Sequence, residues 1–145
     1  MRGFHVGLAA CLAIFSHLAM AEPTFAEKLD GAAAGCAIVG GSGHTEAILA
    51  MRKFGEQSKK YQALVEKSFR DAKACVEEAK PKMKPTFREE ISRYPQIKPA
   101  LTDAYAAWLG YMDWLSTPHE FSATGPESQA YEAAINRLRA EVEAL

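Results

Sequence analysis

The residues best placed for chemistry in this chain are a serine and a histidine in the glycine-rich stretch 40–44. A nucleophilic serine needs a base to accept its proton, and His44 lies only two residues after Ser42. Side chains this close in sequence rarely meet in attack geometry, and the strand-turn-helix context of a nucleophile elbow is missing. The Lys-Ser/Thr that completes a phosphate-binding loop is missing too. We therefore predict a connector between two helices and no catalytic residue.

Two cysteines, Cys36 and Cys75, follow the first 21 residues. Together with His44 and His119 they match no zinc-ligand spacing, and the chain has no Cys-x-x-Cys-His for haem attachment. An even pair of cysteines in an oxidising compartment is typically bonded. We therefore predict a Cys36–Cys75 disulfide, within one chain or between two, and no metal or other cofactor. Within one chain it would close a loop of about 40 residues and stabilise the fold by about 4 kcal/mol.

Aromatic residues crowd the segment 105–118, where Tyr105, Trp108, Tyr111 and Trp114 recur at every third position. At about 100° per residue, Tyr105 and Trp108 fall on the apolar stripe of a helix, whereas Trp114 points nearly opposite to it. An exposed tryptophan beside a tyrosine is typical of an interaction hot spot. We predict a partner-binding surface with these members: Tyr111, Asp113, Trp114, His119, Glu120 and Phe121. The alternative is that the loop after Pro118, or the segment 86–94, covers Trp114.

Apolar residues at intervals of three and four predict helices through most of the chain. The first is expected to begin near Pro23 and end at the glycines of residues 40–43, with Gly31 and Gly35 placed for a close contact with another helix. The next begins after Thr45 and reaches about residue 79. As one straight rod it would carry Cys75 some 45 Å from its start, out of reach of Cys36. The disulfide therefore requires a break, which we predict at residues 54–58.

Prolines mark the remaining boundaries. Pro81 and Pro85 are expected to end the second helical stretch, and Thr86 with Glu89 matches a capping box that opens a short new helix. Pro95 is expected to end that short helix, and Pro99, Pro118 and Pro126 bound the last two helices. No segment alternates with the period of a half-buried strand. The sequence thus predicts a single all-α domain over residues 22–145, a bundle of four or five helices.

The first 21 residues match a cleavable signal peptide, with Arg2 before an apolar run and Ala-Met-Ala at its end. The residues before Cys11 also match the pattern that precedes a lipid-modified cysteine. Because the apolar run continues past Cys11, we favour cleavage near Ala21 and release as a soluble protein into the periplasm or the medium. No later segment is long and apolar enough to span a membrane.

Charge is distributed unevenly along the chain, although the formal net charge is only −1. Residues 52–98 are net basic, and the segments on either side are net acidic. So small a net charge argues against nucleic-acid binding. The pattern fits either neighbouring helices that attract one another or a basic face that meets an acidic partner.

A small exported helical protein with one cysteine pair and no catalytic constellation is similar in general description to the periplasmic immunity proteins that neutralise cell-wall-degrading toxins. It is equally similar to small helical periplasmic chaperones and adaptors, and both likenesses lie at the level of the fold. We expect a non-enzymatic binding protein that acts by occluding a protein partner. A carrier of a lipid, aromatic or haem ligand, held between helices against Tyr105, Trp108 and Met112, is the alternative.

Overall fold

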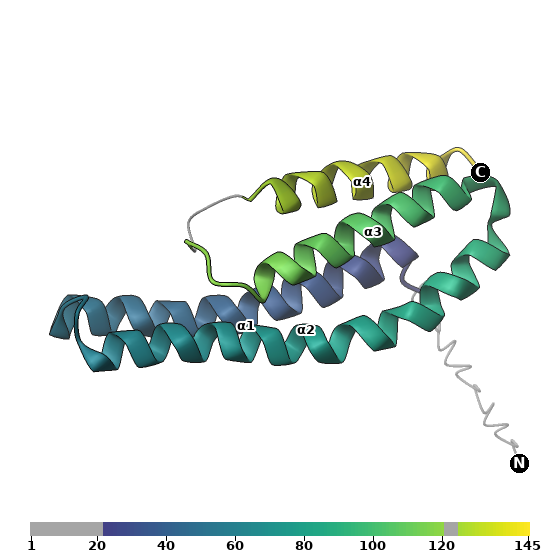
Figure 1. Cartoon of the computed structure of the whole chain (residues 1–145). Coiled ribbons are helices and arrows are strands. Elements are labelled where there is room, and N and C mark those ends of the chain that lie inside the picture. Colours follow the sequence, from purple (N-terminus) through teal and green to yellow (C-terminus); the bar gives the residue numbers. More distant parts are fainter. Residues whose placement is uncertain (1–21, 121–124) are drawn as a thin grey trace, which may run out of the picture.

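The computed structural model describes residues 22–120 and 125–145, which form four α-helices and one short 3-10 helix without a strand. The helices are α1 (Phe25–Phe54), α2 (Lys59–Arg93), α3 (Lys98–Leu115) and α4 (Pro126–Glu143), with η1 (Pro95–Ile97) before α3. Figure 1 shows α1 and α2 as a long antiparallel hairpin, with α3 and α4 packed along one half of it. The predicted all-α bundle is confirmed. The predicted signal peptide, with Cys11, lies outside the described residues.

Helix α1 continues through the glycine-rich stretch, so the predicted helix end at residues 40–43 is wrong. A Cβ on Gly43 would lie 2.7 Å from the Cβ of Ser68 in α2, and one on Gly40 would lie 3.3 Å from the Cβ of Ala72. Glycine lowers helix propensity, but here it lets two helix backbones approach closely. This packing across the hairpin holds the segment helical. Glycines suggested a turn in the sequence. In the structure, their lack of a side chain is what allows α1 and α2 to approach so closely.

Two other glycines of α1 do not make the close contact predicted for them. A Cβ on Gly31 or Gly35 would meet nothing within 4 Å, because both residues lie on the solvent side of the helix. The close approach occurs farther along, on the stripe that faces α2. Glycines about one helical turn apart do contact α2, but they are Gly40 and Gly43. The sequence predicted the contact for a pair on the opposite, solvent-facing side of α1.

The break between α1 and α2 is where the sequence predicted it. Phe54 ends α1, and Gly55 follows with φ of +84°, a conformation that favours glycine. The Gly55 N–H donates to the Met51 carbonyl at 2.8 Å. Ser58 then caps α2, because its hydroxyl accepts a hydrogen bond from the Tyr61 N–H at 3.2 Å.

Helix α2 runs through Pro81 and Pro85, so the predictions that they end it and that Thr86 caps a new helix are wrong. Both prolines are exposed on the solvent side, whereas Met83 is buried against the core. A proline removes one backbone donor and bends a helix without necessarily ending it, when packing holds the next turn. Figure 1 shows α2 curving over its last turns toward the start of α3. The other predicted proline boundaries are confirmed.

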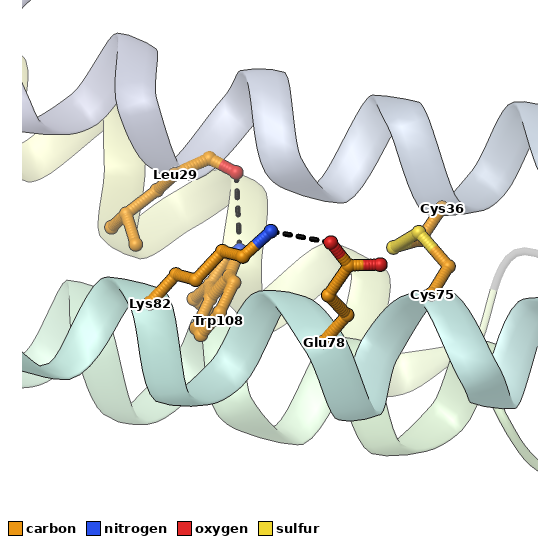
Figure 2. Close-up of a disulfide and its surroundings, with 6 residues drawn as sticks. All are labelled: Leu29, Cys36, Cys75, Glu78, Lys82 and Trp108. Atoms are coloured by element: carbon orange, nitrogen blue, oxygen red, sulfur yellow. Dashed lines mark hydrogen bonds and ion pairs between the residues drawn. A yellow bond between two sulfur atoms is a disulfide. The ribbon is translucent and has the colours of Figure 1, made fainter.

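The core lies where α3 and α4 cover the hairpin. Trp108 is fully buried, and its Nε1–H donates to the Leu29 carbonyl at 3.0 Å (Figure 2). Other fully buried large side chains surround it, namely Leu29, Leu101, Met112, Ile135 and Leu138. The N-terminal end of α1 is fixed by a capping box, in which the Glu27 N–H donates to the Thr24 hydroxyl at 3.3 Å.

Cys36 and Cys75 form a disulfide within the chain, with their Cα atoms 5.4 Å apart. The bond closes residues 37–74, which we call the outer hairpin and which project past α3 and α4 (Figure 1). This confirms the predicted pairing and resolves it as intramolecular. Such a bond is compatible with an oxidising compartment outside the cytoplasm. Within the described residues, none of the helices has the length and apolarity needed to cross a membrane.

Candidate functional site

Trp114, predicted to be exposed, is half-buried. His119 from the following loop stacks on its ring with the centroids 3.7 Å apart, and Tyr111 stacks beside it at 5.8 Å. At the indole edge, a Cβ on Gly125 would lie 2.7 Å from Nε1 of Trp114, so only glycine fits there. The alternative in which the loop after Pro118 covers this tryptophan is therefore correct. Helix geometry alone could not place that loop.

The side chain of His119 contacts both the end of α3 and the outer hairpin. Its ring meets Phe69 of α2 edge-on, with the centroids 5.3 Å apart, and its Nδ1 lies 2.7 Å from the Thr117 carbonyl oxygen. Burial lowers the pKa of His44 in α1, and the charge of His119 lowers that pKa further. The two imidazoles thus lie close enough to interact electrostatically.

A depression of about 340 Å³ lies beside this aromatic cluster. Tyr111, Trp114 and His119 line it. So do small residues of α1 and α2, including Gly40, Gly41 and Ala72, and Glu132 of α4. We call this depression the aromatic groove. Aromatic rings beside a carboxylate suit a basic or an aromatic side chain.

Tyr111, which lines the aromatic groove, is half-buried, and its ring stacks on that of Tyr131 with the centroids 5.3 Å apart. Burial raises the pKa of Tyr111, and the nearby Glu132 carboxylate raises it further. The phenol therefore stays neutral at physiological pH and offers a hydroxyl donor.

The remaining predicted site residues lie around the groove. Asp113 is exposed and pairs with Lys80 of α2. Glu120 is exposed, and Phe121 lies outside the described residues. The structure therefore gathers three of the six predicted residues, Tyr111, Trp114 and His119, into one site.

A second depression, of about 620 Å³, lies at the other end of the bundle and was not predicted. Its apolar lining includes Phe25, Tyr94, Leu101, Leu138 and Val142. No sequence signal pointed to it, because the lining comes from segments that lie far apart along the chain.

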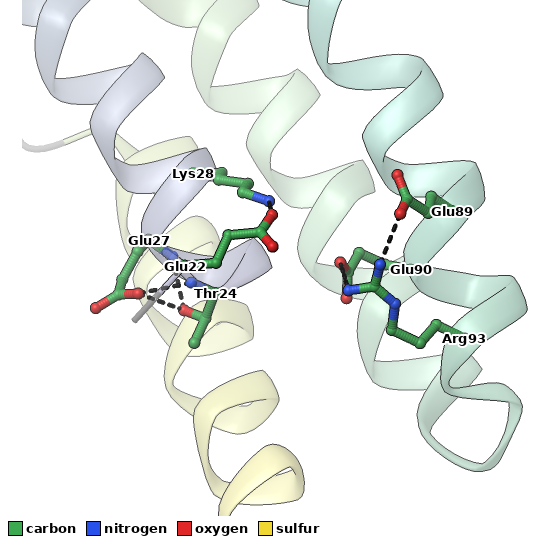
Figure 3. Close-up of polar contacts among 7 residues, drawn as sticks. All are labelled: Glu22, Thr24, Glu27, Lys28, Glu89, Glu90 and Arg93. Carbon is green, nitrogen blue, oxygen red and sulfur yellow. Dashed lines mark hydrogen bonds and ion pairs between the residues drawn. The ribbon is translucent and has the colours of Figure 1, made fainter. Parts of the chain in front are cut away.

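Several residues that line the larger depression are charged, and Figure 3 shows ion pairs that they form. Lys28 pairs with Glu22 at 2.8 Å, and Arg93 pairs with Glu89 at 2.7 Å. The hydrogen bond to Lys28 lowers the pKa of Glu22. The basic residues that line this depression are thus paired within the chain.

The location expected for a carried ligand is filled by protein. Trp108 and Met112 are fully buried, and Tyr105 stacks on Phe87 with the centroids 4.3 Å apart. None of Tyr105, Trp108 and Met112 lines either depression. A ligand would therefore have to bind elsewhere.

The predicted absence of catalysis at Ser42 and His44 stays a prediction, but its physical basis has changed. Both residues lie on the continuous helix α1, where side chains two residues apart point about 200° away from each other. Over residues 22–120 and 125–145, no group of three or more His, Cys, Asp and Glu side chains is arranged to hold a metal ion.

Comparisons with protein-family models, with curated proteins and with solved structures find no match to this chain. What the fold and the site define is a class: a disulfide-linked all-α bundle with an aromatic groove at one end of α3.

Proposed function

We propose that this chain is an exported binding protein that occludes a protein partner, and that the aromatic groove is its contact surface. The observation that carries the proposal is the stack of Tyr111, Trp114 and His119 beside an open depression. Stacked rings are rigid, so binding costs them little conformational entropy, and aromatic residues are enriched at interaction hot spots. The disulfide supports export, because such bonds persist in oxidising compartments.

A basic side chain of the partner suits this groove best. The exposed carboxylate of Glu132, which lines the groove, offers a negative charge to such a side chain, and the stacked rings offer apolar surface to its methylene stem. An immunity-type inhibitor would place a lysine or arginine of its target here.

The first test is capture of a partner from co-resident periplasmic and secreted proteins, followed by titration calorimetry with the purified partner. Glu132→Gln keeps the shape of the exposed side chain and should weaken binding by about tenfold, which corresponds to 1.4 kcal/mol. Trp114→Ala should weaken it further. Leu49→Ala removes an exposed apolar residue of the outer hairpin and is the matched control. Unchanged affinity in both groove variants would refute the proposed surface.

A carrier function is the second candidate, because the larger depression is big enough for a small apolar ligand. Native mass spectrometry of the purified protein should then show a bound mass. Val142→Trp, which fills part of the depression, should remove it. Capture of many unfolded chains in place of one stoichiometric partner would instead favour a chaperone.

A further inference from the structure

The turn of the outer hairpin, residues 52–60, carries an unusual concentration of positive charge. Arg52, Lys53, Lys59 and Lys60 are all exposed, against the single acid Glu56. We call residues 52–60 the basic tip. Figure 1 places it at the far end of the α1–α2 hairpin, away from α3 and α4.

The bases of the basic tip lack the carboxylate partners that other lysines have. Farther along α2, Lys67 and Lys82 each pair with an acid one helical turn away. Within the described residues, Arg52, Lys53, Lys59 and Lys60 form no ion pair with a carboxylate. The positive charge of the basic tip is therefore available to an external anionic partner.

An aromatic residue lies among these charges. Phe54 is 47% exposed. The Nζ atoms of Lys53 and Lys60 lie 5.3 and 4.9 Å from its ring centroid. Aromatic rings flanked by lysines are favoured at membrane interfaces, where the ring enters the headgroup region and the ammonium groups reach phosphates.

We propose that the basic tip docks on a bilayer surface rich in anionic phospholipid, with Phe54 inserted at headgroup depth. The tip is the projecting end of the hairpin and lines neither of the two depressions, which suits a flat surface better than a ligand that must be enclosed. An extended polyanion such as nucleic acid would also meet the net acidic segments at either end of the chain, whereas a planar surface meets only the tip. The disulfide and the close Gly43–Ser68 packing hold the hairpin as a rigid support.

The proposal predicts steep dependence on charge. Each basic residue near an anionic surface strengthens binding by about fivefold, and the effect fades with added salt. The protein is expressed from the full chain and purified as the cell leaves it. It is then sedimented with vesicles of phosphatidylglycerol and phosphatidylcholine in equal parts, and with pure phosphatidylcholine vesicles. Binding is expected only to the anionic vesicles, and weaker at high salt.

Two matched double variants separate the effect of the basic tip on vesicle binding from the effect of the overall net charge. Lys53→Gln with Lys60→Gln should weaken binding to anionic vesicles by roughly 25-fold. Lys84→Gln with Arg88→Gln removes the same charge from two exposed bases outside the outer hairpin and should change binding little. Phe54→Ser should weaken binding to a smaller extent, and Trp114→Ala should leave it unchanged. Equal losses in both double variants, or equal binding to both kinds of vesicle, would overturn the proposal. The proposal would also be overturned if the Lys53→Gln, Lys60→Gln variant still bound vesicles but no longer captured an acidic protein.

Discussion

The two halves of the α1–α2 hairpin are held together by different means. In the half that α3 and α4 cover, large side chains such as Leu29 and Trp108 fill the core. In the outer hairpin, most of the buried positions are small: Gly40, Ala47, Ala50, Ser68 and Ala72. The outer hairpin also carries four large exposed apolar side chains, Ile38, Val39, Leu49 and Phe54. Helix α1 thus passes from a core element to a largely solvent-facing one near Cys36.

This difference shows why the disulfide lies where it does. A hairpin of two helices buries little apolar surface, and burial stabilises by only about 25 cal/mol per Å². Close backbone packing at Gly43 helps, but contributes no large side chain to bury. The Cys36–Cys75 bond joins the helices at the boundary between the two halves. We infer that the outer hairpin depends on the covalent bond, whereas the covered half depends on its core.

Loss of the disulfide should have the largest effect and tests this division directly. Cys36→Ser with Cys75→Ser should lower the free energy of unfolding by about 4 kcal/mol, because the unfolded chain regains loop entropy. Urea denaturation measures the loss. Hydrogen exchange should show protection falling first within residues 37–74. Equal loss of protection in α3 and α4 would contradict the division into two halves.

A change in the covered core should come next. Trp108→Phe removes the hydrogen bond to the Leu29 carbonyl and leaves a void in a fully buried site. We expect a loss of about 2–3 kcal/mol in the free energy of unfolding. Trp114→Phe is the matched control, and because Trp114 is half-buried it should cost less than about 1 kcal/mol. Similar costs for the two would mean that the core is not centred on Trp108.

A pair of glycine substitutions tests the packing within the outer hairpin. Gly43→Ala forces a methyl group to within 3.0 Å of the Ser68 backbone, so the helices must separate, and we expect a loss of about 1–2 kcal/mol. Gly35→Ala adds the same methyl group in open space and should stabilise by up to about 1 kcal/mol through helix propensity. Thermal unfolding of both variants checks the opposite signs. The same sign in both would show that the close approach at Gly43 does not matter.

The smallest predicted effect is a pH dependence centred on His44. Its pKa is lowered in the folded protein by burial and then by His119, so the unfolded chain binds more protons in mild acid. The stabilising contribution is therefore full above about pH 6.5 and is lost as pH falls below that value. Carboxyls with a lowered pKa, such as Glu27, change the stability with pH only below about pH 4.5. His44→Gln should flatten the decline in urea midpoint between about pH 7.5 and 5.5. If the urea midpoint of this variant falls with the same slope, the pH dependence arises from another group.

Local signals explain which parts of the fold could be predicted. The break at residues 54–58 and the starts of α3 and α4 depend on glycine, serine and proline acting within one turn. The pairing of Cys36 with Cys75 was predicted from the cysteine count, and the need for a break followed from that pairing and from the helix lengths. The failures at Gly40 and Pro81 have one cause. Packing against a distant segment outweighed a local preference of about 1–3 kcal/mol.

The candidate site divides in the same way. Its aromatic members, Tyr111, Trp114 and His119, were predicted from type and spacing. Their burial was not, because it depends on how the loop after α3 folds back over Trp114. The larger depression at the other end of the bundle had no sequence signal for a similar reason: its walls come from several elements.

By itself, the sequence determined the helical class, the capacity for one disulfide and the position of the hairpin turn, because periodicity, cysteine count and helix caps are properties of neighbouring residues. Only the tertiary structure decided which half of α1 is covered, which glycines meet another helix and which aromatic rings stay accessible. Those outcomes depend on contacts between residues 25 to 101 positions apart, such as Gly43 with Ser68 and Tyr131 with Asp30. The energy of such a contact depends on how well the two partners fit together, so it cannot be derived from the sequence around either partner alone.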